Sequence, residues 1–148
     1  MIYASIIFLI SLSVYLVALF NFKRGLIFKK ITSENVDSPP VSIVVAVRNG
    51  EKNCTRLLNS LQKQNYSGQL EFLIVDDASS DNTPFIINDF VSVDSRFIYV
   101  HSSKGNSILS HKKKALDAGI NMASYEHLLF TDIDCIIHSN WVNDMIKS

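Results

Sequence analysis

The chain has 148 residues, of which 47% are hydrophobic and 19% are charged, and its 14 basic and 14 acidic side chains give no net charge. This length predicts about one domain, and the apolar content excludes a disordered chain of high net charge. The charge balance argues against a nucleic-acid-binding protein, and two cysteines, Cys54 and Cys135, are too few for a disulfide scaffold.

An uncharged apolar stretch opens the chain. Residues 2–22 carry no Asp, Glu, Lys or Arg, and at ~1.5 Å per residue a helix over this stretch can cross the roughly 30 Å hydrocarbon core of a bilayer. Four basic residues follow at once: Lys23, Arg24, Lys29 and Lys30. This excess of positive charge predicts a single-pass protein of the cell membrane whose bulk lies in the cytoplasm. A cleaved signal peptide is the alternative, but no basic residue precedes the stretch and no A-x-A-like cleavage site follows it.

The next segment, 23–40, is a basic linker between this stretch and the rest of the chain. Its lysines and arginine could contact anionic lipid headgroups, or serve only as a topology signal. Pro39-Pro40 makes a stiff, extended entry into the first predicted strand. We therefore expect a transmembrane anchor at 1–22, a juxtamembrane linker at 23–40 and a globular part at 41–148.

Strand-like and helix-like patterns alternate after the linker. Runs rich in apolar and β-branched residues predict strands at 41–47, 71–75, 96–100 and 127–131. Apolar residues at helical spacing predict helices at 51–64, 84–92, 109–123 and 140–146. The short connections between them favour an α/β fold, with a mostly parallel sheet and helices on both faces.

Three polar turns directly follow predicted strands. They are Arg48-Asn49 after the first strand, Asp76-Asp77 after the second and Asp132-Ile133-Asp134 after the fourth. In an open parallel sheet the binding crevice lies beyond the carboxyl ends of the strands. We therefore expect these turns to converge on one rim of the sheet.

The last of these turns is a candidate metal site. Asp132 and Asp134 are two residues apart, so in extended backbone their carboxylates point to the same side and repel unless a cation lies near them. Oxygen ligands suit Mg²⁺ or Mn²⁺, and Mg²⁺ is commonly held by one or two carboxylates together with substrate phosphates. The alternative is a solvated loop that happens to carry two acids.

Other polar residues leave two interpretations open. Asp76 and Asp77 cannot both be core groups, because a buried unpaired carboxylate is costly. One could accept hydrogen bonds from a base or a ribose, while the other caps the following loop. The lysines at 112–114 lie near a helix start, where one could approach a diphosphate or all could form a solvated basic face. Cys135 is expected to be a small buried residue, and Trp141 is expected to pack the last helix.

Taken together, these segments resemble the family 2 glycosyltransferases of the GT-A fold. The resemblance rests on VSIVVAVRNGEKN at 41–53, EFLIVDDASSDNT at 71–83, KKKALDAGI at 112–120 and LLFTDIDCIIHSNWVNDM at 128–145. It covers residues 40–148 and implies a Rossmann-like domain that binds a nucleotide-sugar donor. The implied reaction transfers a sugar, from a UDP-sugar by this resemblance, to an acceptor hydroxyl.

The resemblance also implies roles for individual residues. The end of the first strand and its loop would contact the nucleobase, and in this chain they are Ala46, Arg48, Asn49 and Glu51. Asp76 and Asp77 would bind uracil or ribose, with Asp77 favoured as the base contact. Lys113 or Lys114 would approach the diphosphate. Asp134 would ligate Mg²⁺ or Mn²⁺ directly, and Asp132 would be its ribose or water-mediated partner.

A general base is the missing part of this assignment. In inverting members of the family the base is an Asp in a later segment, and we find no candidate for it after Asp134. The expected function is therefore sugar transfer onto an unknown acceptor, such as a cell-envelope polysaccharide or a lipid-linked glycan. The alternative is a truncated or non-catalytic module that binds the nucleotide sugar and acts with a partner chain or a missing C-terminal half.

Overall fold

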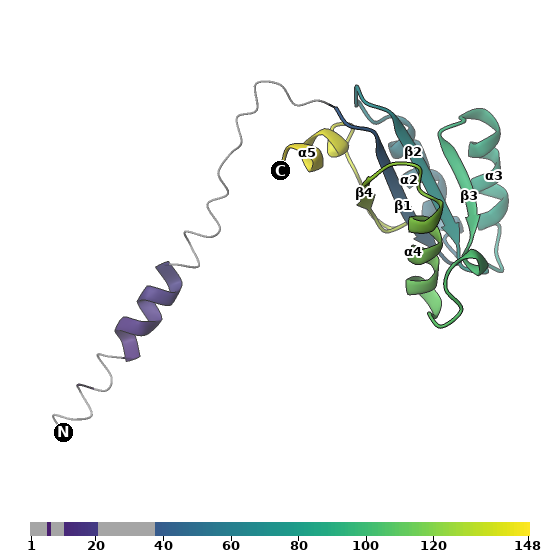
Figure 1. The fold of residues 1–148 in the computed structure, drawn as a ribbon. Helices are drawn as coiled ribbons and strands as arrows, with labels where there is room; N and C mark the ends of the chain where they lie inside the picture. Colours follow the sequence, from purple (N-terminus) through teal and green to yellow (C-terminus); the bar gives the residue numbers. More distant parts are fainter. Residues whose placement is uncertain (1–5, 7–10, 21–37) are drawn as a thin grey trace. The chain divides into compact units, whose positions relative to one another are not determined.

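A computed structural model describes residue 6 and residues 11–20 and 38–148 (Figure 1). The chain divides into two compact units, Met1–Ser33 and Glu34–Ser148. In the first unit residue 6 and residues 11–20 are helical. Among the described residues, none of the helices has both the length and the hydropathy needed to span a bilayer. Most of the predicted linker, and the remainder of the predicted anchor, lie outside the described residues.

The second unit is built on a parallel sheet. Its strands are β1 (Val41–Val47), β2 (Leu70–Asp76), β3 (Phe97–His101) and β4 (His127–Phe130), in the order β3-β2-β1-β4. All three pairings between neighbours are parallel, and the last paired residues are Val47 with Asp76, Asp76 with His101 and Val44 with Phe130. The strands therefore all end at the same rim, as the sequence predicts, and β4 stops short of β1.

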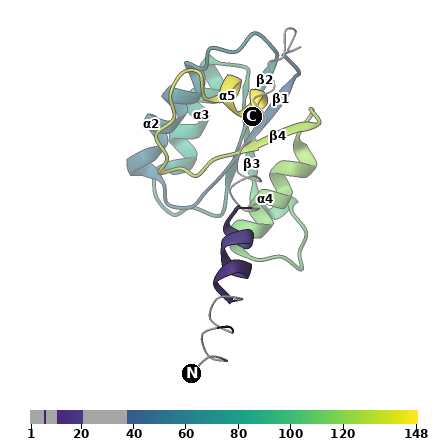
Figure 2. The ribbon, with the colours of Figure 1, turned by 90° about the vertical axis from the view of Figure 1, so that its left-hand side faces the viewer.

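Helices cover both faces of this sheet, as predicted. They are α2 (Glu51–Gln62), α3 (Thr83–Val93), α4 (His111–Met122) and α5 (Trp141–Lys147). Figures 1 and 2 show α4 on one face and α2 and α3 on the other. Alternate residues of β1 point into two cores, since Ile43 and Val45 pack with α2 and α3 whereas Val44 packs with α4.

A close approach fixes α4 on its face of the sheet. Gly119 is buried against β1 and β2, and a methyl group added to it would lie 2.4 Å from Cγ1 of Val44 and 3.0 Å from Cγ2 of Val75. No larger side chain fits there without displacing these stiff, β-branched neighbours. The glycine thereby sets how closely α4, whose first turn reaches the rim, can pack on the strands.

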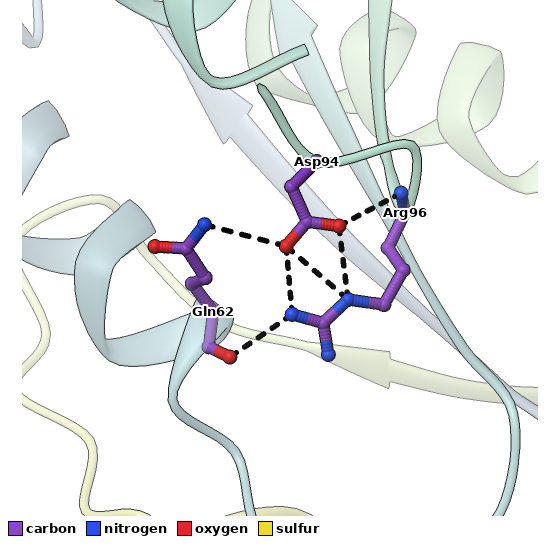
Figure 3. A network of polar contacts seen from close by, with 3 residues as sticks. All are labelled: Gln62, Asp94 and Arg96. Carbon is purple, nitrogen blue, oxygen red and sulfur yellow. Dashed lines mark hydrogen bonds and ion pairs between the residues drawn. The ribbon is translucent and has the colours of Figure 1, made fainter. Parts of the chain in front are cut away.

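The amino end of the sheet is held by a polar network between α2, α3 and β3 (Figure 3). Nη2 of Arg96 donates to the Asp94 carboxylate at 2.7 Å and to the carbonyl oxygen of Gln62 at 3.0 Å. The hydrogen bond from Arg96 holds the pKa of Asp94 below its usual value. This network lies at the opposite end of β3 from the rim, so it stabilises the fold without lining the site.

Most element ends differ from the predicted ranges by one or two residues, and β2 extends to Asp76, which the sequence predicts to lie in the turn. The main differences lie between β3 and α4. The helix predicted from Leu109 begins only at His111, because the preceding loop folds back on α4: Asn106 N–H donates to the Asp117 carboxylate at 2.8 Å and Leu109 N–H to the Asn106 carbonyl oxygen at 3.0 Å. A short 3-10 helix, Ser102–Lys104, also precedes this loop.

The prediction that Cys135 is buried is wrong. Cys135 is exposed and Cys54 is the buried cysteine. Residues 132–135 form a turn on the rim, and it is Ile133 that packs inward against the core. Trp141 packs against the same core, as expected.

Candidate functional site

A cavity of about 490 Å³ lies at the carboxyl ends of β1, β2 and β4, where the three polar turns meet. It is walled by the turn after β1, the first residue after β2, the turn after β4 and the start of α4. The lining residues are Ala46, Val47, Arg48, Asn49, Gly50, Asn53, Asp77, His111, Lys112, Asp132, Ile133 and Asp134. The predicted convergence of the turns on one rim is therefore confirmed.

The turns after β1 and β2 are locked together by hydrogen bonds. Asn49 N–H donates to Oγ of Ser79 at 2.9 Å, and Ser80 N–H donates to Oδ1 of Asn49 at 2.8 Å. Gly50 N–H donates to the buried hydroxyl of Thr83 at 2.8 Å. The Ser-Ser-Asp-Asn-Thr segment at 79–83 thus holds Asn49 and Gly50 in place on the cavity wall without lining the cavity itself.

The same segment also caps α2, which begins directly below the cavity. Asp81 accepts a hydrogen bond from Glu51 N–H at 3.1 Å, and the Glu51 carboxylate accepts one from the Asn82 side chain at 2.9 Å. Hydrogen bonds from Thr83, the largest cause, and from Glu51 lower the pKa of Asp81. Backbone N–H groups at a helix start are otherwise unpaired, so this exchange ties α2 to the turn after β2.

The two neighbouring acids after β2 have separate environments. Asp76 is buried, and its carboxylate accepts hydrogen bonds from Ser79 N–H and the Tyr99 hydroxyl, both at 3.1 Å. Burial, followed by the negative charge of Asp76, raises the pKa of Tyr99 to about 12. Asp77 is half-buried and lines the cavity, with its N–H bonded to the Val47 carbonyl oxygen at 2.8 Å. Asp77 therefore lies on the cavity wall, whereas Asp76 holds the turn.

Basic side chains face the acidic ones across the cavity. Nη1 of Arg48 lies 3.8 Å from the Asp77 carboxylate and 3.4 Å from Nδ1 of His111. Nζ of Lys112 lies 2.5 Å from Oδ1 of Asp132, and both side chains are more than half exposed. Exposed ion pairs of this kind contribute little to stability, so a ligand can replace either partner at low cost.

Three non-glycine residues around this rim adopt left-handed backbone. They are Asn49 with φ 52°, Ala78 with φ 54° and His111 with φ 51°. Such conformations are uncommon for residues with a Cβ and are typical of functional turns that the surrounding structure holds in place. They lie after β1, after β2 and at the start of α4, where the chain turns sharply beside the cavity.

The predicted metal ligands suit a hard cation in part. Asp132 and Asp134 are both exposed and line the same cavity, and their carboxylate oxygens are the donors that Mg²⁺ and Mn²⁺ prefer. Across the described ranges, no cluster of three His, Cys, Asp or Glu side chains is placed to hold a metal ion. The two carboxylates would supply only part of the ligand set that such a cation needs.

The structure brings together most of the residues singled out from the sequence. Ala46, Arg48, Asn49, Asp77, Asp132 and Asp134 all line the cavity. Four others stand outside its lining: Glu51 and Asp76, which brace the turns, and Lys113 and Lys114, which follow Lys112 on α4.

Sequence reasoning missed two polar wall residues, Asn53 and His111, and left Lys112 open as one of three lysines that could approach a diphosphate. Lys112 is the lysine of α4 that reaches the cavity, because the helix begins at His111 and turns the next two lysines away from the wall. Asn53 lies in the first turn of α2, directly after the polar turn at 48–50, and this position could have indicated it. His111 carries no spacing signal, since its place depends on the left-handed turn.

The family model for glycosyl transferase family 2 matches residues 42–148. The chain belongs to this family. It is 33% identical over 117 residues to the poly-beta-1,6-N-acetyl-D-glucosamine synthase of Staphylococcus epidermidis, covering 78% of this chain and 26% of that protein. It is 29% identical over 108 residues to the glycosyltransferase GlyG of Streptococcus pneumoniae, covering 72% of this chain and 34% of that protein.

Solved structures of glycosyltransferases share the fold. Staphylococcus aureus TarS in complex with UDP matches 72% of this chain and 30% of its own, with 30% identity and a TM-score of 0.58. The mannosyltransferase PcManGT of Pyrobaculum calidifontis, solved with GDP-Man and Mn²⁺, matches 80% of this chain and 34% of its own, with 24% identity and a TM-score of 0.65. The chain thus spans about a third or less of the length of these relatives.

Proposed function

We propose that the cavity is the donor site of a glycosyltransferase that takes its sugar from a UDP-sugar. The observation that carries this proposal is the placement of Asp77 and the Asp132–Asp134 pair on the wall of one cavity of about 490 Å³. One acid is thereby available to a nucleobase or ribose and the pair to a diphosphate-bound cation. The match to TarS, solved with UDP at 30% identity, supports a uridine nucleotide as the ligand.

Each wall residue has a proposed role toward the nucleotide. Asp77 accepts hydrogen bonds from the base or ribose, and Arg48 and Asn49 form the wall beside it, next to Ala46 at the end of β1. Asp76 and Glu51 act from outside the cavity by holding these turns through their hydrogen bonds to Ser79 and Asn82. Lys112 lines the same cavity as Asp132 and Asp134, and we assign it the approach to the diphosphate that the family resemblance implies for Lys113 or Lys114.

A divalent cation is part of this proposal. Asp134 would hold Mg²⁺ or Mn²⁺ directly, and Asp132, once released from Lys112, would contact the ribose or hold the cation through a water molecule. When bound, the cation supplies neutralising charge to the leaving diphosphate. The chain's own part would be to hold the donor between Asp77 and Lys112, which lie on the same cavity wall.

The acceptor is proposed to be a growing cell-envelope polysaccharide or a lipid-linked glycan. One relative is a poly-beta-1,6-N-acetyl-D-glucosamine synthase, and the uncharged stretch at 2–22 would place this chain at the cytoplasmic face of the cell membrane. The anchor at 1–22 and the linker at 23–40 belong to this proposal and rest on the sequence.

A nucleotide-sugar-binding module without turnover of its own is the second candidate. The carboxylates on the described wall of the cavity are Asp77, Asp132 and Asp134, and each already has a role in holding the donor. None of these is left over to deprotonate an acceptor hydroxyl, so a general base would come from another segment or a partner chain. Incubation with UDP-sugars alone and then with added partner protein distinguishes the two candidates by release of UDP.

Calorimetry with UDP tests the proposed donor site. We expect the full chain in detergent to bind UDP in the presence of Mn²⁺ or Mg²⁺ and to lose that binding in chelator, because two carboxylates provide too few ligands for the cation without a diphosphate. Equal affinity in chelator would contradict the metal role. Absence of binding under both conditions would contradict the donor site itself.

A further inference from the structure

The hydrogen bonds of β4 do not fix the position of the turn that carries the two candidate metal ligands. We call residues 132–135 the acidic turn. The pairing of β4 with β1 ends at Phe130, and the next contact, from Thr131 N–H to the Val44 carbonyl oxygen, is long at 3.5 Å. Cys135 N–H donates to the Asp132 carbonyl oxygen at 3.1 Å, so the acidic turn closes on itself rather than on the strand.

An apolar contact holds the acidic turn against the start of α2. Ile133 is half-buried and packs on the core that includes Val47, while the acids on either side of it are exposed. A methyl group added to Gly50 would lie 2.5 Å from Cγ2 of Val47 and 3.1 Å from Cγ1 of Ile133, so the lack of a side chain at Gly50 lets both of these residues pack beside it. With Ile133 seated in this way, Asp132 and Asp134 face the cavity.

A second contact comes from Arg56, one turn further along α2. Its Nη2 donates to the backbone carbonyl oxygen of Asp134 at 3.0 Å and to Oδ1 of Asn53 at 3.2 Å. Seventy-eight positions in sequence separate Arg56 from Asp134. A guanidinium donor makes a stronger hydrogen bond than a neutral group, and the two N–H groups of Nη2 allow it to donate to both oxygens at once.

We infer that Arg56 and Ile133 are positioning residues for the candidate metal ligands, so that α2 rather than β4 sets where Asp132 and Asp134 stand. This inference rests on the proposed function and deepens it. Arg56 holds the main chain at Asp134 and Ile133 holds the side of the turn that faces away from solvent. Groups that orient metal ligands from behind in this way strongly influence metal affinity.

The binding test separates metal affinity from nucleotide affinity in the full chain. At fixed UDP, Arg56→Gln should raise the Mn²⁺ concentration for half-saturation about tenfold. The UDP affinity at saturating Mn²⁺ should change much less, because the cavity wall around Asp77 is untouched. Arg56→Lys, which keeps the charge and a donor, should restore part of the Mn²⁺ affinity. Lys52→Gln removes the same charge from an exposed position of α2 and is the matched control.

Two results would overturn the inference. One is a loss of Mn²⁺ affinity in Lys52→Gln as large as in Arg56→Gln, which would show that the loss of one positive charge alone explains the effect. The other is an equal loss of UDP and Mn²⁺ affinity in Arg56→Gln, which would indicate a general loss of structure.

A measurement without ligand keeps this inference distinct from the proposed function. In the free chain, the backbone amide signals of Asp134 and Cys135 should shift in Arg56→Gln and in Ile133→Ala, and much less in Ile133→Val or Lys52→Gln. If the shifts in Arg56→Gln are no larger than those in Lys52→Gln, the inference is wrong whether or not UDP binds. If the shifts occur but the unmodified chain binds no UDP with Mn²⁺, the positioning stands and the donor site is wrong.

Discussion

The Gly50 amide donates a hydrogen bond of 2.8 Å to the Thr83 hydroxyl, across 33 positions of sequence. This bond joins the turn after β1 to the first residue of α3, directly after the turn that follows β2, and both of its partners are buried. It shows how the polar residues after Asp77 act: they hold the neighbouring turn in place and leave Asp77 itself open to the cavity.

Thr83→Val should destabilise the chain and weaken UDP binding. The substitution keeps the shape of the side chain but leaves the buried Gly50 N–H without an acceptor, at a cost of about 1–3 kcal/mol in the free energy of unfolding. Thr83→Ser retains the acceptor and is the control. Chemical denaturation measures the effect, and equal stability of the two variants would show that the hydrogen bond contributes nothing.

Asp134→Ala should abolish metal-dependent UDP binding while leaving the fold intact. Its side chain is exposed on the rim, so we expect the free energy of unfolding to stay within about 0.5 kcal/mol of the unmodified chain. Calorimetry with UDP and Mn²⁺ measures the loss, with Asp89→Ala on α3 as the matched exposed carboxylate. A collapse of the thermal transition in Asp134→Ala would contradict its placement on a solvated rim.

Acid should weaken the network at the amino end of the sheet. The pKa of Asp94 is lowered in the folded chain by its hydrogen bond from Arg96, so its contribution to stability is present above the unfolded value, about 3.9, and is lost as pH falls through the folded value. Denaturation followed from pH 6 downward should show a smaller decline below about pH 4 in Asp94→Asn than in the unmodified chain. Parallel pH profiles for the two proteins would refute the role given to this carboxylate.

Gly119→Ala should destabilise the chain although alanine is the better helix former. The added methyl group meets Val44 and Val75 at 2.4 and 3.0 Å, and such overpacking costs roughly 1–3 kcal/mol, more than the propensity gain of about 1 kcal/mol. Thermal unfolding measures the balance. Asn121→Ala, at an exposed position near the end of α4, is the control for substitution to alanine in this helix. A Gly119→Ala variant that is more stable than the unmodified chain would show that α4 can move away from the sheet freely.

Sequence patterns predicted the fold well because each element carries its own signal. The β-branched run at 41–47 is buried on both faces, as such runs are in parallel sheets, and the helices follow the apolar spacing. The rim was predictable for the same reason, since turns that follow parallel strands must share one edge. Boundaries depended on tertiary contacts, as the late start of α4 at His111 shows.

The details of the site required contacts that local patterns do not encode. Asp76 and Asp77 are adjacent and identical in type, and what separates them is the Tyr99 hydroxyl on the neighbouring strand β3. Of the lysines at 112–114, Lys112 lines the cavity because of the rotation of α4 about its own axis. The loop at Asn106, which is hydrogen-bonded to Asp117 of α4, helps to set that rotation. The link between Arg56 and the Asp134 carbonyl oxygen joins α2 to the acidic turn, and no spacing in the sequence points to it.

The central claim is that one nucleotide spans the cavity from Asp77 to Asp134. Titration of the full chain with UDP in Mg²⁺, followed through the backbone amide signals of both residues, tests it most directly. We predict that both signals shift with a single dissociation constant, and that Asp77→Asn weakens the titration seen at Asp134 as much as that seen at residue 77. A shift confined to one wall, or a titration at Asp134 that is unchanged by Asp77→Asn, would contradict the account.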